Sequence, residues 1–198
     1  VIAYSNRFQN ECSLIVYHNK FNTTSGWINI ASPFLKNGGN GNGKQKVSEN
    51  LVQNLCLTGG LNRYVIFRDF ISGLEFIREI DSLQKDGLFI ELEAFKYQVF
   101  LDFREVEDSE SGIYRKLHDS LNGKGVSSIE EALVEMVFKP IVQCAEQLLF
   151  DIYTRYLQSD SSAKIKPMAG KEFEERVEEL IRITAEITDS KYDCALIS

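Results

Sequence analysis

Two pairs of glutamates occupy alternate positions in strand-like segments, Glu91 with Glu93 and Glu105 with Glu107. Alternate residues of a strand point to one face, so each pair places two carboxylates side by side. Facing carboxylates hydrolyse glycosidic bonds when they lie about 5 Å apart for retention or about 6.5–9.5 Å apart for inversion. The same alternation is typical of the solvent-exposed face of a half-buried strand. We interpret both pairs as such a face and assign no catalytic residue.

Aromatic side chains offer a second kind of chemistry, because sugar rings stack on exposed aromatic faces. The chain has 13 Phe, 8 Tyr and one Trp. Trp27 follows Gly26 at the start of a predicted strand, and Tyr17, His18 and Asn19 lie one hairpin away. Together they would form an aromatic platform with polar edges that binds carbohydrate. The alternative is that Trp27 fills the core, as large aromatic residues commonly do.

Metal and cofactor sites are not indicated. His18 and His118 lie in different predicted elements, and neither H-E-x-x-H nor a Cys/His ligand spacing occurs. The glycine-rich stretch 37–43 lacks the Lys-Thr of a phosphate-binding loop. The four cysteines are widely spaced, without a C-x-x-C pair: Cys12, Cys56, Cys144 and Cys194. We expect them to be isolated core thiols rather than zinc ligands or a disulfide framework, and we predict no metal and no cofactor.

Composition excludes further classes of function. The 198 residues include 22 Lys and Arg against 29 Asp and Glu, which gives a formal net charge of −7 and a pI near 5.0. Such a chain is not a basic nucleic-acid binder, and no apolar run approaches the roughly 18 residues of a membrane span. It begins with Val1 in a strand-like run rather than with a signal peptide. We therefore expect a cut or processed piece of a larger protein in the cytoplasm.

The chain up to residue 106 has the pattern of short strands. Seven runs rich in β-branched and aromatic residues are separated by turn-forming Asn, Gly and Ser. They predict strands over residues 1–4, 13–18, 26–30, 64–70, 74–80, 87–92 and 97–106. Asn37–Gly43 is predicted to be a mobile loop, and one short capped helix is predicted after Ser48.

Beyond residue 106 the apolar period changes to that of helices. Helices are predicted over 113–121 and 129–137, with a third beginning at Pro140 and a fourth over 173–187. A polar linker over 159–170 precedes the last. The change of period predicts an α+β chain with two parts: a strand domain over residues 1–107 and a helical extension of three to four helices over residues 108–198.

Three segments of the first part carry a resemblance. They are the opening V-I-A-Y-S-N-R-F-Q-N-E-C-S-L-I-V-Y-H-N of residues 1–19, the hairpin R-D-F-I-S-G of residues 68–73, and the strand pair of residues 87–100. In order and spacing they resemble the C-terminal β-sandwich of the alpha-amylase family of glycoside hydrolases. Residues 17–28 and 100–106 look most like a branch of large bacterial amylase-like proteins whose sandwich is followed by a helical tail.

The resemblance implies an antiparallel β-sandwich without catalytic residues, because the family's catalytic acids lie on a barrel of about 250 residues. The chain would be a C-terminal accessory domain that stabilises or positions the catalytic barrel of its parent chain. That parent would act on α-glucans with retention of configuration. The implied partners are the barrel and an α-glucan, not nucleic acid or a membrane. Two alternatives stay open: a carbohydrate-binding module for α-glucans, and a helical protein-interaction module.

Overall fold

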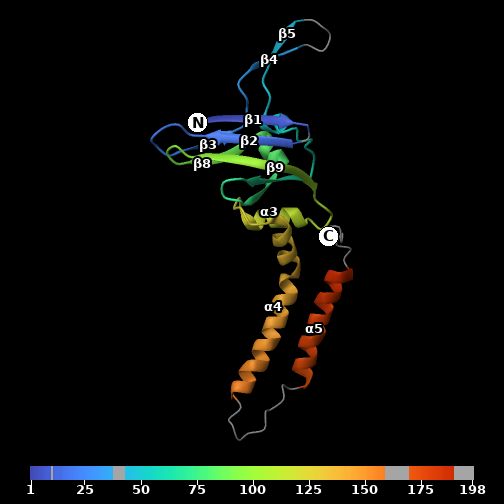
Figure 1. Ribbon diagram of the computed structural model, residues 1–198. Helices are drawn as coiled ribbons and strands as arrows, with labels where there is room; N and C mark the ends of the chain where they lie inside the picture. The colour runs from blue at the N-terminus through green and yellow to red at the C-terminus, as the bar shows by residue number, and fades with distance from the viewer. Residues whose placement is uncertain (10, 38–42, 159–169, 190–198) are drawn as a thin grey trace. The chain divides into compact units, whose positions relative to one another are not determined.

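The computed structural model describes residues 1–9, 11–37, 43–158 and 170–189. Within them the chain is α+β, with antiparallel strands β1–β9 and helices α1–α5, as the sequence pattern predicts (Figure 1). It divides into two compact units, residues 1–129 and residues 130–198.

A five-stranded antiparallel sheet forms the body of the first unit, in the order β1-β2-β9-β6-β7. Its strands are β1 (Ile2–Phe8), β2 (Glu11–Tyr17), β9 (Tyr97–Glu107), β6 (Arg63–Asp69) and β7 (Glu75–Glu79). Each overlaps a segment that the β-branched and aromatic pattern predicts to be a strand, although β1 extends to Phe8, beyond the predicted residues 1–4. The order brings distant segments together, since β2 pairs with β9 through Leu14 opposite Phe100.

An irregularity in β9 interrupts the strand pairing at the centre of this sheet. The pairing of β6 with β9 shifts register between Ile66 and Arg68. Opposite the shift, Asp102 adopts a φ of 57°, and a left-handed residue at a register shift is typical of a β-bulge. The next residue, Phe103, packs against the core, with its ring centroid 5.2 Å from that of Phe67.

A second layer covers one face of the sheet. It consists of the ribbon of β3 (Thr24–Ile28) with β8 (Leu88–Leu92), and the short helices α1 (Leu51–Asn54) and α2 (Ile80–Lys85). β8 alternates buried and exposed residues, as a strand with one dry face does. The core cluster takes residues from both layers: Leu14, Val16, Leu51, Val52, Leu55, Val65, Phe67, Ile80, Leu83, Leu88, Ile90, Leu92 and Phe100. Their burial is the main stabilising contribution to this unit.

The short capped helix predicted after Ser48 is present as α1, whereas α2 is not predicted. α1 is capped by Asn50 rather than Ser48, because the Asn50 side chain accepts the Gln53 N–H while the Gln53 side chain accepts the Asn50 N–H. α2 begins directly after β7, at Ile80, which is the last residue of the predicted strand 74–80. Burial of Ile80 and Leu83 fixes α2 against the core.

A separate ribbon is formed by β4 (Phe34–Asn37) and β5 (Lys44–Val47), which pair with each other. The sequence pattern does not predict these strands, because β5 is polar and largely exposed. Of the loop predicted over Asn37–Gly43, Asn37 belongs to β4, and residues 38–42 lie outside the described residues.

The segment after β9 remains part of the first unit. The Asp108 carboxylate accepts the backbone N–H groups of Tyr114 and Arg115 and so caps α3 (Ile113–Leu121). Val126 then exchanges two backbone hydrogen bonds with Glu75 of β7. The boundary therefore lies at residue 129 rather than at residue 107, because α3 and the loop that follows it pack on β7.

A buried carboxylate joins these elements. Glu75 is 3% exposed. It accepts hydrogen bonds from Arg68 at 3.0 Å, from Arg104 at 3.3 Å and from the backbone N–H of Ile129 at 2.8 Å. Burial by itself would raise the pKa of Glu75, but these donors together lower it below its usual value. Glu75 is thus ionised at neutral pH.

The described part of the second unit consists of α4 (Ile129–Gln158), which starts at the last residue of the first unit, and α5 (Gly170–Asp189). Pro140 lies inside α4, so the expectation that a new helix begins there is wrong. Proline at this position removes one backbone hydrogen bond from a helix that otherwise continues on both sides. An ion pair of 3.4 Å joins Arg176 of α5 to Asp151 of α4. The linker expected over 159–170 lies outside the described residues except for Gly170.

Candidate functional site

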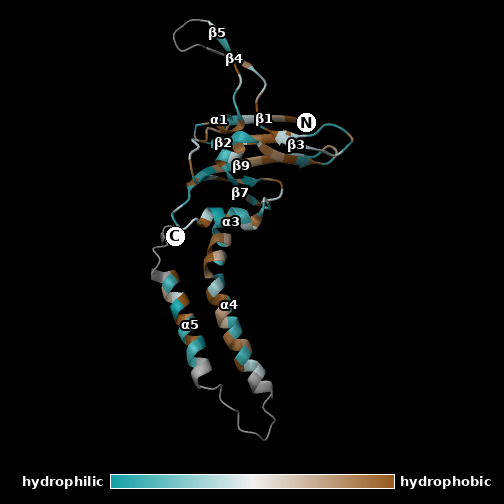
Figure 2. Cartoon of the chain, turned by 180° about the vertical axis from the view of Figure 1, so that it is seen from behind, coloured by the Kyte–Doolittle hydropathy of each residue, from teal (hydrophilic) through white to brown (hydrophobic). Residues whose placement is uncertain are grey.

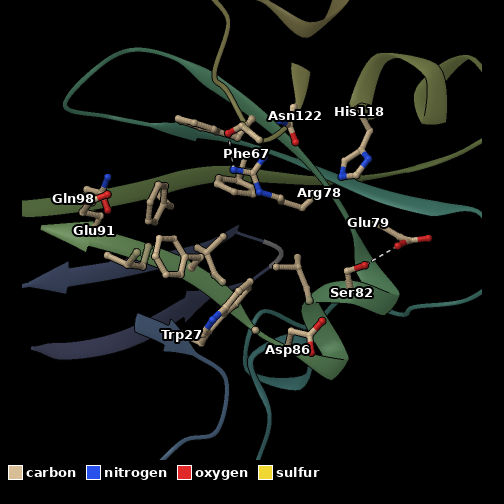
Figure 3. A pocket seen from close by; sticks show the side chains of 18 residues that line it. Trp27, Phe67, Arg78, Glu79, Ser82, Asp86, Glu91, Gln98, His118 and Asn122 are labelled. Carbon is tan, nitrogen blue, oxygen red and sulfur yellow. Dashed lines mark hydrogen bonds between the residues drawn. The ribbon is translucent and has the colours of Figure 1, made fainter. Parts of the chain in front are cut away.

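A cavity of about 520 Å³ in the first unit lies between the five-stranded sheet and the layer of β8 and α2 (Figure 3). Its volume is within the range of small-molecule sites. Apolar residues form its deeper part: Phe67, Phe76, Leu83, Leu88, Ile90 and Phe100. Polar residues line the rest: Arg78, Glu79, Ser82, Asp86, Glu91, Gln98, His118 and Asn122. An apolar interior with a few polar groups is the usual composition of a ligand pocket.

Two aromatic side chains, Trp27 and Phe89, lie at the exposed side of this cavity. They face each other across the β3–β8 ribbon, with ring centroids 5.3 Å apart in an edge-to-face arrangement. Trp27 is 62% exposed and Phe89 is 49% exposed. The interpretation that Trp27 fills the core is therefore wrong. Trp27 has the exposure that an aromatic platform requires.

Arg78 is the cation of the cavity. Its guanidinium donates to the backbone oxygens of Ile77 and Gly123, both at 2.8 Å, and lies 5.5 Å from the ring of Phe76. Burial lowers the pKa of Arg78 below its usual value. Within the described residues no carboxylate forms an ion pair with Arg78. A guanidinium has five N–H donors, so Arg78 keeps donors for a ligand.

Gln98 supplies an acceptor on the opposite side of the cavity. Its side-chain oxygen is buried and has no hydrogen-bond partner among the described residues. A buried carbonyl oxygen without a donor costs free energy, since it has lost its water. A ligand hydroxyl would recover that cost once a turn of the Gln98 side chain brings this oxygen to the cavity surface. Gln98 projects from β9 near Glu91 of β8 (Figure 3).

Carboxylates outnumber cations around the cavity. Glu79, Asp86 and Glu91 line it together with Arg78, and Glu79 accepts a hydrogen bond from the hydroxyl of Ser82. The excess of negative charge disfavours an anionic ligand. It suits a ligand whose hydroxyls donate to carboxylates and accept from the guanidinium.

The two glutamate pairs occupy different surroundings. Glu105 bonds to Thr58 and Arg63, and Glu107 pairs with the same guanidinium at 3.2 Å. These contacts account for Glu105 and Glu107 as part of a surface ion-pair network. Glu91 and Glu93 are exposed, as the interpretation of a solvent-exposed strand face predicts.

The remaining residues of the expected platform lie elsewhere in the fold. Tyr17 is half-buried at the end of β2, and Asn19 is exposed. His18 is 4% exposed, and its Nε2 lies 2.7 Å from the backbone oxygen of Asn22. Neither this cavity nor a second one of about 530 Å³ includes Tyr17, His18 or Asn19, whereas Trp27 lines both. Of the four residues expected in the platform, only Trp27 therefore lines these two cavities, and its neighbours there are other residues than the expected ones.

Phe89, Arg78 and Gln98 are the candidate residues that the sequence reasoning missed. Each lies in a predicted strand, but on a strand of its own, in β8, β7 and β9 respectively. Only the pairing of these strands brings them to one cavity. For Phe89 the sequence contains one indication, the alternation of apolar residues in β8, which predicts that Phe89 and Glu91 point away from the core.

The cysteines depart from the expectation of isolated core thiols. Cys56 is exposed, while Cys12 and Cys144 are half-buried. Arg7 donates a hydrogen bond to the Cys56 sulfur at 2.7 Å. Among the described residues no three His, Cys, Asp or Glu side chains are grouped so as to hold a metal ion. No helix in the described ranges is both long enough and apolar enough to cross a membrane.

Large apolar side chains are also exposed along α4, where apolar residues recur over its length (Figure 2). They include Val142, Leu149, Phe150, Ile152 and Tyr153, of which Leu149 and Phe150 are each 64% exposed. Exposed apolar side chains this numerous on one helix are typical of a surface that contacts another protein.

Comparisons with known proteins found no matching family model, no similar curated protein and no matching solved structure. The candidate site is therefore defined by its geometry alone.

Proposed function

We propose that this chain is the non-catalytic accessory region of an amylase-like glycoside hydrolase, and that its first unit binds α-glucan at the Trp27 cavity. The resemblance of residues 1–106 to the C-terminal sandwich of that family supports the accessory role. The two layers of the first unit are interpreted as that sandwich, in which α1 and α2 take the place of strands in the second layer.

One observation carries the carbohydrate-binding role: Trp27 and Phe89 are exposed beside a cavity in which, within the described part of the chain, the Gln98 oxygen has no donor and Arg78 has no carboxylate partner. A pyranose ring has an apolar face that packs on an aromatic ring, and hydroxyls at its edge that both donate and accept. A neutral sugar therefore matches the aromatic side, the donors and the carboxylates together.

Isothermal titration calorimetry of the full chain with maltoheptaose tests this role, with cellohexaose as the β-linked control. Trp27 is also the single tryptophan of the chain, so its fluorescence reports directly on occupancy. We expect heat and a fluorescence change with maltoheptaose. Trp27→Ala should weaken binding by roughly tenfold, as loss of one aromatic contact does.

Phe8→Ala is the matched control, because Phe8 is an aromatic residue 71% exposed that lines neither cavity. It should bind as the unchanged chain does. A flat titration of the unchanged chain at millimolar maltoheptaose would refute the carbohydrate-binding role. Equal weakening by both variants would place the contact outside this cavity.

The accessory role has its own test, the size of the native product in source cells by immunoblot with an antibody against this chain. A band several times larger than 22.6 kDa is expected. A band near 22.6 kDa would contradict the accessory role and leave the binding role standing.

A helical protein-interaction module is the second candidate, favoured by the exposed apolar side chains of α4. In this case the second unit would contact its own copy or another chain through that helix. Light scattering of the purified chain distinguishes self-association from a monomer.

A further inference from the structure

Two of the four cysteines meet at the edge of the core. In the β1–β2 hairpin Arg7 is directly opposite Cys12, and residues opposite each other in a hairpin point to the same side. The guanidinium of Arg7 donates to the sulfur of Cys56 at 2.7 Å. One arginine therefore adjoins both thiols. Burial raises the pKa of Cys12, and the neighbouring Cys56 adds to the rise, which requires the two sulfurs to lie close together.

The backbone at Cys56 is unusual for a residue with a side chain. Cys56 has a φ of 56° and follows Leu55, the C-cap residue of α1. Its N–H bonds to the Gln53 oxygen at 3.1 Å, and the Leu57 N–H bonds to the Val52 oxygen at 3.0 Å. This pair of bonds ends a helix through a left-handed residue, a position that favours glycine. A cysteine at this left-handed position is strained, and its thiol lies against the Arg7 guanidinium.

We propose that Cys12 and Cys56 are a dithiol site that closes reversibly to a disulfide when the chain meets a low-molecular-weight disulfide such as oxidised glutathione. In the first step the Cys56 sulfur attacks one glutathione sulfur. The glutathione disulfide bond breaks, a mixed disulfide forms on Cys56, and the leaving thiolate takes the proton that Cys56 gives up. In the second step the Cys12 sulfur attacks Cys56, and the second glutathione leaves with the proton of Cys12. The two protein thiols are oxidised, and one glutathione disulfide is reduced to two thiols.

The order of the steps follows from exposure. Cys56 is exposed, whereas Cys12 is half-buried and packs against the core cluster. A reagent in solution therefore reaches Cys56 first. The Arg7 guanidinium donates to the Cys56 sulfur at 2.7 Å and so holds this atom in position for the attack. Cys12 then acts as the resolving thiol.

The test uses the full chain with Cys144→Ser and Cys194→Ser, so that two thiols remain. After oxidised glutathione we expect an intact mass lower by two hydrogen atoms, without a glutathione adduct, and a cross-linked peptide pair that contains Cys12 and Cys56. Dithiothreitol should restore the original mass. Because the disulfide closes a loop from β2 to the end of α1, the oxidised form should melt at least about 5 °C higher than the reduced form.

Two variants keep the proposal falsifiable. In the same background Cys12→Ser should stop at the mixed disulfide on Cys56, because the resolving thiol is lost. Cys56→Gly suits the left-handed position, so it keeps the fold and should form neither the cross-link nor the rise in melting temperature. Separate glutathione adducts on both cysteines, two thiols that remain open to alkylation, or disulfide-linked dimers would each overturn the proposal.

Discussion

Replacing Glu75 by glutamine tests whether its ionised carboxylate stabilises the first unit through its contacts with Arg68, Arg104 and the backbone of Ile129. The Arg68 and Arg104 side chains are 47% and 39% exposed, so solvent screens both ion pairs and each contributes at most about 1 kcal/mol. The hydrogen bond from Ile129 is buried, and such a bond to a charged acceptor contributes roughly 1.5–3 kcal/mol. Glutamine keeps one acceptor oxygen, but its amide N–H₂ group faces donors. Glu75→Gln should therefore lower the free energy of unfolding by about 2 kcal/mol.

Urea denaturation followed by the fluorescence of Trp27 measures this change, because Trp27 belongs to the first unit. Glu110→Gln is the control, since Glu110 is exposed and should change stability by less than about 0.5 kcal/mol. A Glu75→Gln variant as stable as the control would refute the reasoning.

The pH dependence gives a second test of the same carboxylate. The pKa of Glu75 is lower in the folded state than its usual value, which is about 4.3 in an unfolded chain. Its contribution is therefore complete above that value and is lost as the pH falls through the lower folded-state pKa. The stability difference between the unchanged chain and Glu75→Gln should shrink when the pH falls from 6 to 3. A difference that stays constant over this range would contradict an ionised Glu75.

Two further predictions concern packing and association. Gly87 and Gly73 both have positive φ, of 91° and 72°, but an added Cβ at Gly87 collides with the backbone oxygen of Ile28, whereas at Gly73 it meets nothing within 4 Å. Gly73→Ala should cost about 1 kcal/mol and Gly87→Ala at least about 3 kcal/mol in urea denaturation; equal costs would show that the loop moves to relieve the collision. If α4 binds its own copy, light scattering should show a dimer that Leu149→Glu converts to a monomer, while Glu110→Gln remains dimeric. A dimer that persists in Leu149→Glu would exclude this part of α4 from the contact.

The sequence pattern predicts the elements that have a local signature. β6 and β9 are long β-branched and aromatic runs, and the period of 3.6 residues identifies α3. Elements without such a signature were missed. α2 continues β7 without a turn residue between them, and β5 is polar because little of it is buried. Proline favours the first position of a helix, which predicts a new helix at Pro140, but the apolar pattern continues on both sides of this residue, and the helix does too.

The candidate site depends on strand pairing, which a local pattern does not contain. Trp27 is recognisable from the sequence as a large aromatic in a strand, but its exposure follows from the pairing of β3 with β8. Arg78 and Gln98 share the cavity only because β6 lies between β7 and β9 in the sheet. The proximity of Cys12 and Cys56 depends in the same way on where the end of α1 lies in the core, which the cysteine spacing does not reveal.

The strand order also determines when the sheet can be completed during synthesis. β1 and β2 form a hairpin of residues 2–17, and among the strands that the structure describes the second neighbour of β2 is β9, with Leu14 paired to Phe100. During synthesis the β2 edge of the hairpin therefore stays unpaired until residues 97–107 have emerged from the ribosome. An unpaired strand edge is a template for other chains. The newly made chain is thus most open to misassembly, or to capture by a chaperone, during the interval between β2 and β9.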